Sequence, residues 1–478
     1  MLSARGIRYE MADRARGMAC GGIGMIHTLA RKVRLIDEIN QRLKLLKVHL
    51  PYHESDHVLN IAYNLLAGGQ RIEDLELLRN DEAYLDALGT QRIPDPTTAG
   101  DFCRRFREAD IEMLFEAIHA ARKRVWALQP RAFFDKAVLD VDGTFVPTLG
   151  ECKAGMDISY NGIWGFHPLL VSLSNTQEPL LIENRSASRP SHENAAARID
   201  QAVTWCREAG FRSVRVRGDT DFTQTRHLDR WDDEGLEFVF GIDAMPNLVA
   251  LASRLDAGVW KQLDREPKYE RHGPERARPA NIKEQIVRDR GYKNLRLISE
   301  DVVDVAYEPT ACKRDYRLVI VRKNLSVERG EHVLFDNVRY FFYLTNDWDS
   351  TPAQIVFDAN DRCNQENLIA QLKSGVQALR APVSDLESNG AYMAMASLAW
   401  TLKAWFALSL PETGRWAKEH AEQKRTVLRM EFRSFVNAFI RIPVQIVQQG
   451  RQLIYRVLGW NRWLAVLFRG WDQLTQRC

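Results

Sequence analysis

The chain has 478 residues, of which 45% are apolar and 27% charged, the composition of a globular protein with two or three domains. Its 66 Lys and Arg nearly balance 63 Asp and Glu. The net charge of +3 excludes a wholly basic nucleic-acid coat protein, although it leaves room for local basic faces. The seven cysteines are scattered and form no CxxC pair, so we expect a reduced, cytoplasmic protein without a disulfide framework or a zinc site.

The first 130 residues are predicted to be helical, because apolar residues recur there at i, i+3 and i+4 spacing, for example between Leu35 and Leu46. Charge is unevenly distributed along this region. Residues 1–50 carry ten Lys or Arg and four acids, whereas residues 51–120 carry six and fourteen. The small net charge therefore hides a strong separation of charge.

After about Phe133 the pattern changes to short runs rich in Val, Leu and Ile, which are typical of strands. Helical stretches at 193–209 and 223–234 separate the later runs, so an α/β or mixed-sheet domain is predicted. Residues 250–300 are highly charged and are predicted to be irregular. The expected strands are Lys136–Val146, Leu169–Leu173, Ser213–Arg217, Glu237–Ile242, Tyr316–Val321 and Arg339–Thr345.

Two strong helix signals follow. A capping box of Thr351 and Gln354 predicts a helix over 352–374. From residue 390 the chain is again predicted to be helical. Residues 391–410 are apolar enough to raise the question of a membrane span, but the charge of Lys403 near the centre favours a buried core helix. Beyond them, residues 411–478 carry twelve Lys or Arg against five acids.

Two pairs of carboxylates follow predicted strands. Asp140 and Asp142 lie two residues apart on one strand and therefore share a face, while Ala137, Leu139 and Val141 are expected to point into the core. Asp219 and Asp221 follow the run Ser213–Arg217. Strand ends are where α/β sheets gather their functional groups. Carboxylates brought together there would repel one another, and a divalent cation such as Mg²⁺ is the usual compensation.

The predicted helix 352–374 carries a third acidic position. At about 100° per residue, Arg362, Glu366 and Lys373 fall within roughly 40° of one another on the helix surface. The helix can therefore present one carboxylate with a cation on each side, and such cations suit a phosphate-rich substrate. An ordinary solvated Arg–Glu pair is the alternative interpretation of the same spacing.

One resemblance is to the haloacid-dehalogenase-like phosphatases. Asp140-Val-Asp142-Gly-Thr144 after an apolar strand resembles their first motif, which would make Asp140 the nucleophile and Asp142 the general acid. Gly218-Asp219 resembles their later metal-binding motif. That family needs a lysine shortly before the second motif, and the only lysine between the two motifs, Lys153, lies close to the first.

A second resemblance covers nearly the whole chain. Arg362, Glu366 and Lys373 reproduce the spacing of the Y-R-E-K signature of the DDE transposases of bacterial insertion sequences, with Ala359 at the Tyr position. Asp142-Gly-Thr144 resembles the D-x-T of that family's first strand, and Asp219-Thr-Asp-Phe222 its D-x-G-[FY]. Further segments typical of these enzymes are Gly68–Leu75, Arg92–Thr98, Trp164–Leu170 and Arg189–His192.

The resemblance implies an α/β fold with a ribonuclease-H-like catalytic core, a β-rich insertion, and helical N- and C-terminal regions. The expected divisions are a helical DNA-binding region at 1–130, the core at 131–245 and 346–390, the insertion at 246–345, and a helical C-terminal region at 391–478.

It also implies metal-dependent DNA strand cleavage and strand transfer in the cut-and-paste transposition of an insertion sequence. Asp142, Asp219 and Glu366 would be the catalytic residues and the ligands of Mg²⁺, for which Mn²⁺ could substitute, with Asp140 and Asp221 as secondary candidates. Arg362 and Lys373 would contact DNA phosphates.

The expected partners are double-stranded DNA, as terminal inverted repeats and as target, and a second copy of the chain in a homodimer on paired ends. No membrane association is expected, and the predicted location is cytoplasmic and nucleoid-associated. The basic stretches 1–50 and 411–478 are candidates for DNA contact. A phosphatase and a catalytically inactive, transposase-derived DNA-binding protein remain the alternatives.

Overall fold

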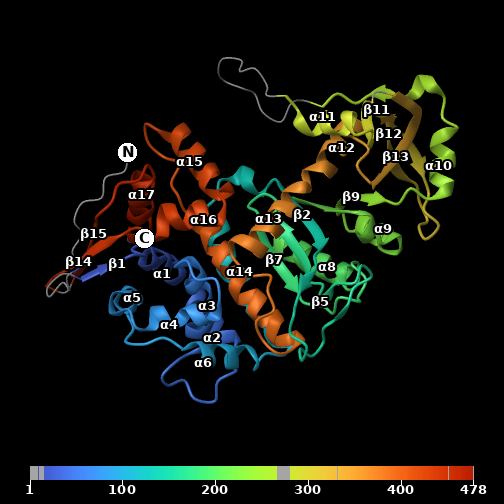
Figure 1. The fold of residues 1–478 in the computed structure, drawn as a ribbon. Coiled ribbons are helices and arrows are strands. Elements are labelled where there is room, and N and C mark those ends of the chain that lie inside the picture. Colours follow the sequence, from blue (N-terminus) through green and yellow to red (C-terminus); the bar gives the residue numbers. More distant parts are fainter. Residues whose placement is uncertain (1–8, 10–15, 266–279, 331, 451, 477–478) are drawn as a thin grey trace.

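The computed structural model describes residue 9 and residues 16–265, 280–330, 332–450 and 452–476. Residues 1–8 and 10–15 of the basic stretch 1–50 lie outside this part of the chain. Within it the protein has a mixed α/β architecture, with a nine-stranded sheet, two three-stranded sheets and many helices (Figure 1).

The N-terminal region is helical, as its apolar spacing predicts. Local capping fixes where helices start: the side chain of Asp95 accepts a hydrogen bond from the Thr98 amide at 2.9 Å, and Pro96 occupies the first turn. The elements are α1 (Ile23–Lys32), α2 (Leu35–Arg42), α3 (Glu54–Leu66), η1 (Ile72–Asp74), α4 (Leu75–Arg79), α5 (Glu82–Leu88), α6 (Pro96–Cys103), α7 (Glu108–Trp126) and η2 (Arg131–Phe134).

The central sheet is built around β2 (Lys136–Gly143), with the order β10-β11-β12-β13-β9-β8-β2-β6-β7. Two strands run parallel to β2 on one side, β8 (Ser213–Gly218) directly beside it and β9 (Glu237–Ile242) beyond. On the other side, β6 (Leu169–Leu173) pairs antiparallel to β2, and β7 (Glu178–Glu183) pairs antiparallel to β6. Ala137, Leu139 and Val141 of β2 are fully buried, which confirms that they point into the core.

Smaller elements complete this part of the chain. The helix α8 (Ala195–Ala209) packs across β2, β6, β7 and β8. A small separate sheet has the order β3-β5-β4. The remaining elements are β3 (Val146–Pro147), β4 (Asp157–Ile158), β5 (Trp164–Phe166), η3 (Thr220–Phe222), η4 (Thr225–His227) and α9 (Leu228–Asp233).

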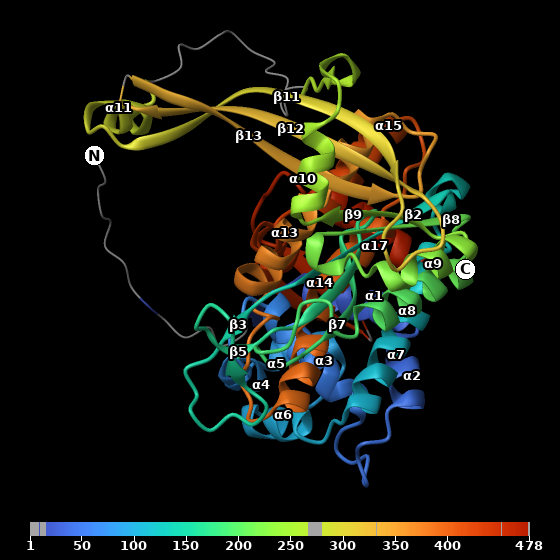
Figure 2. The same cartoon turned by 90° about the vertical axis from the view of Figure 1, so that its right-hand side faces the viewer.

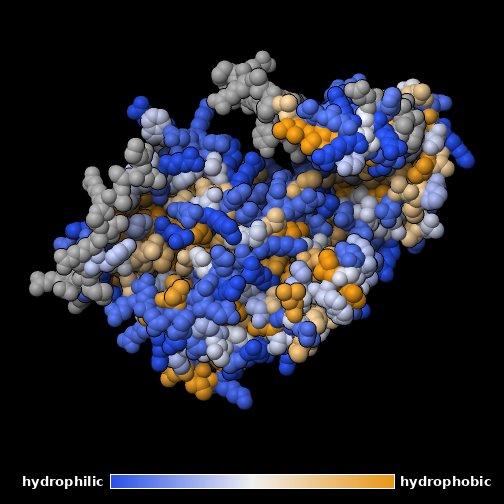
Figure 3. Space-filling model, viewed as in Figure 1, coloured by the Kyte–Doolittle hydropathy of each residue, from blue (hydrophilic) through white to orange (hydrophobic). Residues whose placement is uncertain are grey.

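Three long antiparallel strands extend the sheet into an arm, which projects to one side of the molecule (Figure 2). They are β11 (Lys293–Tyr307), β12 (Tyr316–Arg329) and β13 (His332–Thr345), and the base of β13 pairs with β9. Near the far end of the arm, Ile282 and Ile286 of α11 (Ile282–Asp289) are exposed, and Figure 3 shows an apolar patch in this position. The shorter elements here are α10 (Pro246–Ser253), η5 (Ala257–Val259) and β10 (Lys261–Gln262).

The prediction that residues 250–300 are irregular was wrong outside residues 266–279, which are not among the described residues. The charges that hid strand β11 form cross-strand ion pairs. Glu300 accepts from Lys323 at 3.1 Å, and the next residue, Asp301, accepts from Arg322 at 3.1 Å. Opposite charges on neighbouring strands stabilise a sheet that a hydropathy pattern alone does not reveal.

The predicted helix 352–374 is present as three consecutive segments. These are α12 (Pro352–Asp361), α13 (Cys363–Ala370) and the π-helical turn η6 (Gln371–Gly375). The capping box is confirmed, because the Thr351 and Gln354 side chains bond each other's backbone amides. The prediction of a single continuous α-helix was therefore wrong in detail. The π turn also changes the angle between Lys373 and Glu366 around the helix axis.

The helix α14 (Leu386–Leu408) is buried along nearly its whole length and lies against α3, α7 and β7 (Figure 1). This confirms the buried core helix. Lys403 is fully buried, and its ammonium group donates to the Leu428 carbonyl at 2.7 Å, above the ring of Trp400. Within the described residues, no helix combines the length and apolarity needed to cross a membrane.

The two ends of the chain pack together. Strand β1 (Arg16–Met18) pairs with β14 (Val444–Gln449), so the prediction that the chain is helical from residue 390 was wrong for this strand and its neighbour β15. Glycine is required at position 22, where the N-terminal segment packs against the C-terminal one, because a Cβ there would lie 1.8 Å from the Phe439 carbonyl oxygen. The other C-terminal elements are α15 (Ala417–Arg429), α16 (Phe432–Phe435), η7 (Val436–Ile440), β15 (Gln452–Val457) and α17 (Leu464–Thr475).

Candidate active site

Asp142 lies near the end of β2, with 16% of its side chain exposed. One of its carboxylate oxygens accepts a hydrogen bond from the Gly143 amide at 2.8 Å. The other accepts from the Arg362 guanidinium at 3.2 Å, across 220 residues of sequence. The contact brings together the first acid of the predicted set and the first cation of the predicted helix.

Asp219 lies beside Asp142 because β8 runs parallel to β2 and the two strands end at the same edge of the sheet. Its carboxylate accepts a hydrogen bond from the Asp221 amide at 3.0 Å and so caps the short turn η3. Asp221 itself is exposed to solvent. The geometry therefore gives the two acids different environments, with Asp219 facing the site and Asp221 at its rim.

The helix that carries Glu366 is attached to β2 by its neighbour, Gln365. The buried Gln365 amide donates to the backbone carbonyl of Asp140 at 2.8 Å and to that of Leu170 at 3.3 Å. This contact spans β2 and β6 next to Asp142, and it places Glu366 over the same sheet edge with its side chain exposed.

A buried ion-pair network holds α12 on the sheet. Asp358 of α12 accepts from Arg215 at 2.7 Å and from Arg217 at 2.9 Å, two arginines that share a face of β8. Arg217 also forms a fork with Asp140, with distances of 2.7 and 3.0 Å to its two oxygens. Because α12 leads directly into Arg362 and α13, this network fixes the start of the segment that carries Glu366.

The electrostatics show that the predicted site residues share one neighbourhood. Burial raises the pKa of Asp142 to about 6; Arg362 opposes the shift, while Asp219 and Glu366 add to it. Burial also raises the pKa of Asp219, again against Arg362. Burial lowers the pKa of Lys373, and the charge of Asp142 opposes that change. The charges of Asp219, Glu366, Arg362 and Lys373 therefore all interact with that of Asp142, and Arg362 is in direct contact with it.

Asp140 has a different environment. It is 1% exposed, and both of its carboxylate oxygens are engaged by Arg217. Burial raises the pKa of this carboxyl, and the bonds to Arg217 oppose the shift. A carboxylate enclosed in this way cannot reach a phosphate ester, so the geometry disfavours the phosphatase interpretation, in which Asp140 would be the nucleophile.

The donor set suits a hard divalent cation, because it consists of carboxylates whose mutual repulsion a cation would relieve. In the part of the chain that the structure describes, no group of three or more His, Cys, Asp or Glu side chains is arranged closely enough to hold a metal ion. The guanidinium of Arg362 provides the positive charge at Asp142.

Several residues at this site were not predicted from the sequence. Asp243 directly follows β9, the next strand after β8, and its charge contributes to raising the pKa of Asp219. The sequence pattern that reveals Asp243 was available, because an acid that follows a third apolar strand repeats the arrangement of Asp142 and Asp219 at the first two strands. Arg217 and Gln365 carried no such signal, since their partners are distant in sequence.

Comparison with known proteins identifies the chain as a DDE transposase. More particularly, the family described as Transposase DDE domain group 1 matches residues 16–456, nearly the whole chain, and the chain belongs to this family. No curated protein matches. Among solved structures, the piggyBac transposase synaptic complex with hairpin DNA is 9% identical, with a TM-score of 0.39 over 89% of this chain and 83% of that chain. A likeness of that size carries no argument about this protein.

Proposed function

We propose that Asp142, Asp219 and Glu366 are the catalytic carboxylates of this transposase, and that they act in DNA strand cleavage and strand transfer during cut-and-paste transposition of an insertion sequence. The observation that carries the proposal is the raised pKa of the buried Asp142, to which Asp219 and Glu366 both contribute while Arg362 contacts it directly. Perturbed carboxylates that gather at the ends of strands are typical of catalytic sites.

We also propose that the core is ribonuclease-H-like. The strand order β7-β6-β2-β8-β9 supports this, with β6 antiparallel to β2 and with β8 and β9 parallel to it. In this division the core comprises residues 131–245 and 346–390, and the arm belongs to an insertion at 246–345. Residues 1–130 and 391–478 are the flanking regions.

In this mechanism Asp142, Asp219 and Glu366 would hold Mg²⁺, or Mn²⁺ in its place. Two bound divalent ions would supply activation of the attacking hydroxyl and stabilisation of the leaving oxygen in an in-line displacement. Arg362, which lies 3.2 Å from Asp142, and Lys373 would hold the backbone phosphates on either side of the scissile bond. Asp140 keeps its partner Arg217 throughout and stays outside the chemistry.

The partners in this proposal are double-stranded DNA, first as terminal inverted repeats and then as target, and a second copy of the chain on paired ends. The protein would act in the cytoplasm, associated with the nucleoid.

The proposal is tested by strand cleavage. Purified chain is incubated with a linear duplex that carries the inverted repeats found beside its gene, and the products are resolved on a denaturing gel. We expect nicks at the repeat ends with Mg²⁺ or Mn²⁺, and at least a hundredfold less product in EDTA, restored by excess Mg²⁺. Specific binding of the repeats without cleavage in either metal would instead support the inactive DNA-binding alternative.

A cationic groove in the C-terminal region is the best candidate for a DNA contact within 411–478. The groove has a volume of about 770 Å³, and Arg425, Arg429, Arg462 and Trp463 line it. Figure 3 shows a mainly hydrophilic surface over α15. Next to it, Arg433 donates to the Ser374 carbonyl at 3.2 Å, so this surface continues to the turn that carries Lys373.

Replacing both Arg429 and Arg462 with alanine should weaken DNA binding without unfolding the protein, because both side chains are exposed. Each lost phosphate contact should reduce the slope of log K against log salt concentration by about 0.9. The measurement is fluorescence anisotropy at four salt concentrations. The control is Arg212→Ala, an exposed arginine paired with Asp135 beside the core. Unchanged affinity and slope in the double variant would remove this groove from the DNA path.

A further inference from the structure

Tyr343 of β13 lies in one row of the central sheet with two of the proposed catalytic carboxylates. It pairs with Gly241 of β9. Asp142, Asp219 and Gly241 each lie two residues beyond paired positions on β2, β8 and β9, so the register of these parallel strands continues the row. A Cβ at Gly241 would lie 3.4 Å from the carbonyl carbon of Asp219, in agreement with this arrangement. The row therefore runs Asp142, Asp219, Gly241, Tyr343.

The row lies on the face of the sheet that α12 and α13 cover. The side chain of Asp142 contacts Arg362, which joins these two helices. Tyr343 packs against an apolar cluster that includes Ile355 and Val356 of α12. Residues that lie opposite each other on neighbouring strands direct their side chains to the same face of a sheet. The phenol of Tyr343 and the carboxylate of Asp142 are therefore on the same side.

The charge of Arg362 acts on three members of this row. Burial raises the pKa of Asp142 and of Asp219, and Arg362 opposes the rise in both. Burial also raises the pKa of Tyr343, against the charges of Arg265 and Arg362. The raised pKa keeps the phenol protonated at neutral pH, so its hydroxyl can donate a hydrogen bond. The phenol is therefore in range of the same cation as the two carboxylates.

The hydroxyl of Tyr343 is a donor that the protein itself does not use. Within the described ranges of the chain, no residue forms a hydrogen bond with it. The side chain is half-buried, and its oxygen is not one of the enclosed polar atoms. Backbone phosphates are the main acceptors that DNA offers to hydroxyl side chains. An unused donor in the row of the carboxylates therefore points to a phosphate of the bound DNA as its acceptor.

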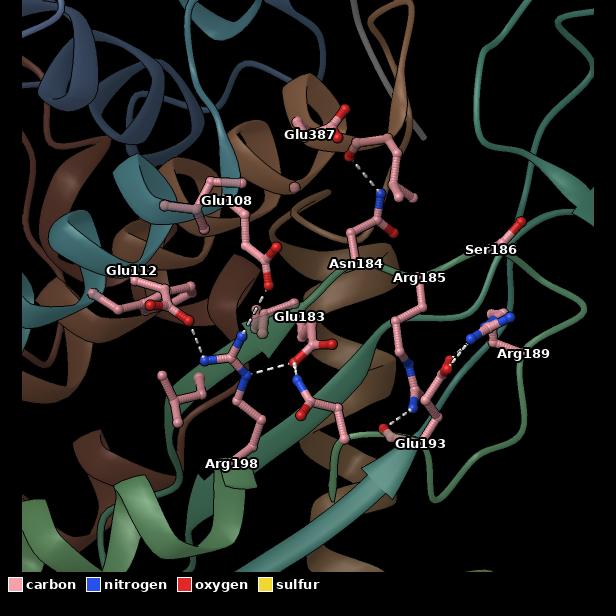
Figure 4. Close-up of a pocket in the computed structure, with 17 residues that line it drawn as sticks. Glu108, Glu112, Glu183, Asn184, Arg185, Ser186, Arg189, Glu193, Arg198 and Glu387 are labelled. Carbon is pink, nitrogen blue, oxygen red and sulfur yellow. Dashed lines mark hydrogen bonds and ion pairs between the residues drawn. The ribbon is translucent and has the colours of Figure 1, made fainter. Parts of the chain in front are cut away.

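The cavity shown in Figure 4 differs in this respect. It has a volume of about 510 Å³, and charged side chains that line it pair with one another. Arg198 contacts Glu108, Glu112 and Glu183. These ion pairs neutralise Arg198, so it is less suited to bind a phosphate than the unpartnered hydroxyl of Tyr343.

The place of Tyr343 in the row determines which phosphate it can reach. Neighbouring strands lie about 4.8 Å apart, so its Cα is about 10 Å from that of Asp219 and about 14 Å from that of Asp142. The scissile phosphate lies at the carboxylates, so the phenol is expected to contact a neighbouring one. Successive phosphates of a DNA strand advance about 3.4 Å along the helix axis, which puts the acceptor within about three nucleotides of the scissile bond.

We propose that Tyr343 is a further DNA-binding residue, whose phenolic hydroxyl donates a hydrogen bond to a backbone phosphate within about three nucleotides of the scissile bond. The phenol keeps its proton, and no covalent bond forms or breaks. The inference rests on the proposed catalytic role of Asp142 and Asp219. Ala359, which occupies the Tyr position of the Y-R-E-K signature, packs against the same apolar cluster as Tyr343. Strand β13 therefore carries the phenol that the helix lacks.

The first test is Tyr343→Phe, which removes only the hydroxyl and keeps the ring in its apolar cluster. Binding of the duplex that ends in the inverted repeat (the repeat-end duplex) is measured by fluorescence anisotropy at four salt concentrations. We expect about tenfold weaker binding. The slope of log K against log salt concentration should not change, because a neutral phenol releases no counterion. Unchanged affinity would overturn the proposal, and so would a changed slope, which indicates the loss of a cation contact.

Tyr340→Phe is the matched control. Tyr340 lies three residues away on the same strand, so its side chain points to the opposite face of the sheet, where its ring lies 6.2 Å from that of Trp260. This variant also loses one phenolic hydroxyl, and it should bind the repeat-end duplex like the natural chain. An equal loss of affinity in both variants would overturn the proposal, because the effect would then not depend on the face that carries Asp142 and Asp219.

A second test changes the DNA and locates the acceptor. Each phosphate within about three nucleotides of the scissile bond is replaced singly by a methylphosphonate, which removes its charge and one acceptor oxygen. At the contacted phosphate the natural chain should lose affinity, and the difference between it and Tyr343→Phe should fall from about tenfold to less than about twofold. A difference that stays about tenfold at every position would show that the hydroxyl acts indirectly, and it would overturn the proposal.

Failure of this inference can be told apart from failure of the proposed function. Cleavage of the repeat-end duplex by Asp142→Ala is measured beside these binding experiments. If Asp142→Ala is inactive and Tyr343→Phe binds DNA like the natural chain, only the role of Tyr343 is overturned. If Asp142→Ala cleaves normally, the proposed catalytic site itself is wrong, and with it the basis for placing the acceptor near the scissile bond.

Discussion

Replacing Asp142 with alanine should abolish DNA strand cleavage, with a loss of at least about a thousandfold, while the protein stays folded and still binds DNA. The carboxylate is the most enclosed member of the proposed catalytic set, and burial raises its pKa to about 6. Removing it takes away a charge that Asp219 and Glu366 both disfavour, so folding should not suffer. Cleavage is measured on the repeat-end duplex with Mg²⁺, and stability by thermal unfolding.

Asp140 provides the matched control, because it lies on the same strand only two residues away. Asp140→Ala leaves the buried Arg217 with Asp358 as its remaining carboxylate partner, so the expected loss is in stability, of about 3 kcal/mol. Below its melting temperature this variant should still cleave DNA. We therefore expect Asp142→Ala to lose cleavage and keep stability, and Asp140→Ala to lose stability and keep cleavage. An inactive but stable Asp140→Ala variant, or an active Asp142→Ala variant, would reverse the assignment.

Asp219 and Glu366 should behave like Asp142. Asp219→Ala and Glu366→Ala are each expected to cost at least about a thousandfold in cleavage, because the proposed set acts as a unit. Asp221→Ala is the control for Asp219, since its exposed carboxylate lies at the rim of the site. Normal cleavage by either of the first two variants would remove that residue from the set.

Local sequence patterns predicted the parts of the fold that local interactions determine. Leu169–Leu173 and Glu237–Ile242 are strands with the predicted bounds, and Thr351 caps its helix as expected. The arm was missed where its strands carry charge in place of apolar alternation. Strand β14 was missed because its partner β1 comes from the opposite end of the chain, and no local signal reports such a partner.

The site shows the same division between local and long-range information. The order and spacing of Asp142, Asp219 and Glu366 could be read from the sequence, and in the structure the charges of Asp219 and Glu366 both act on Asp142. The contacts that hold these residues in place could not be predicted from the sequence. Gln365 reaches the backbone of β2 across 225 residues of sequence. Which acid of the first pair is enclosed by an arginine depends on that arginine's position on β8, which only the fold determines.

The largest loss of stability is expected at Glu178, a fully buried residue at the start of β7. Its carboxylate accepts hydrogen bonds from Arg122 at 3.0 Å, from the indole of Trp126 at 3.1 Å and from that of Trp405 at 2.8 Å. These donors come from α7 and α14, so one side chain joins the sheet to the two helices packed on it. No local sequence pattern indicated this role of Glu178.

Glu178→Ala should lower the free energy of unfolding by about 3–5 kcal/mol, because it leaves the buried Arg122 cation and two indole N–H groups without their acceptor. That is a large part of the total stability of an ordinary domain. The measurement is equilibrium unfolding in urea, followed by tryptophan fluorescence and by circular dichroism. Glu208→Ala is the control: its exposed carboxylate lies 3.6 Å from Lys123, and the change should cost less than about 0.5 kcal/mol.

The double variant Arg122→Met with Glu178→Leu separates the cost of leaving the Arg122 cation unpaired from the cost of the other lost contacts of Glu178. If the cost of Glu178→Ala comes from the unpaired cation, removing both charges and keeping apolar volume should recover most of the stability. If the double variant is as unstable as the single one, the hydrogen bonds from Trp126 and Trp405 are the dominant contribution. A Glu178→Ala protein that unfolds at the same urea concentration as the natural chain would contradict both explanations, and with them the role of Glu178 as the link between the sheet and its helices.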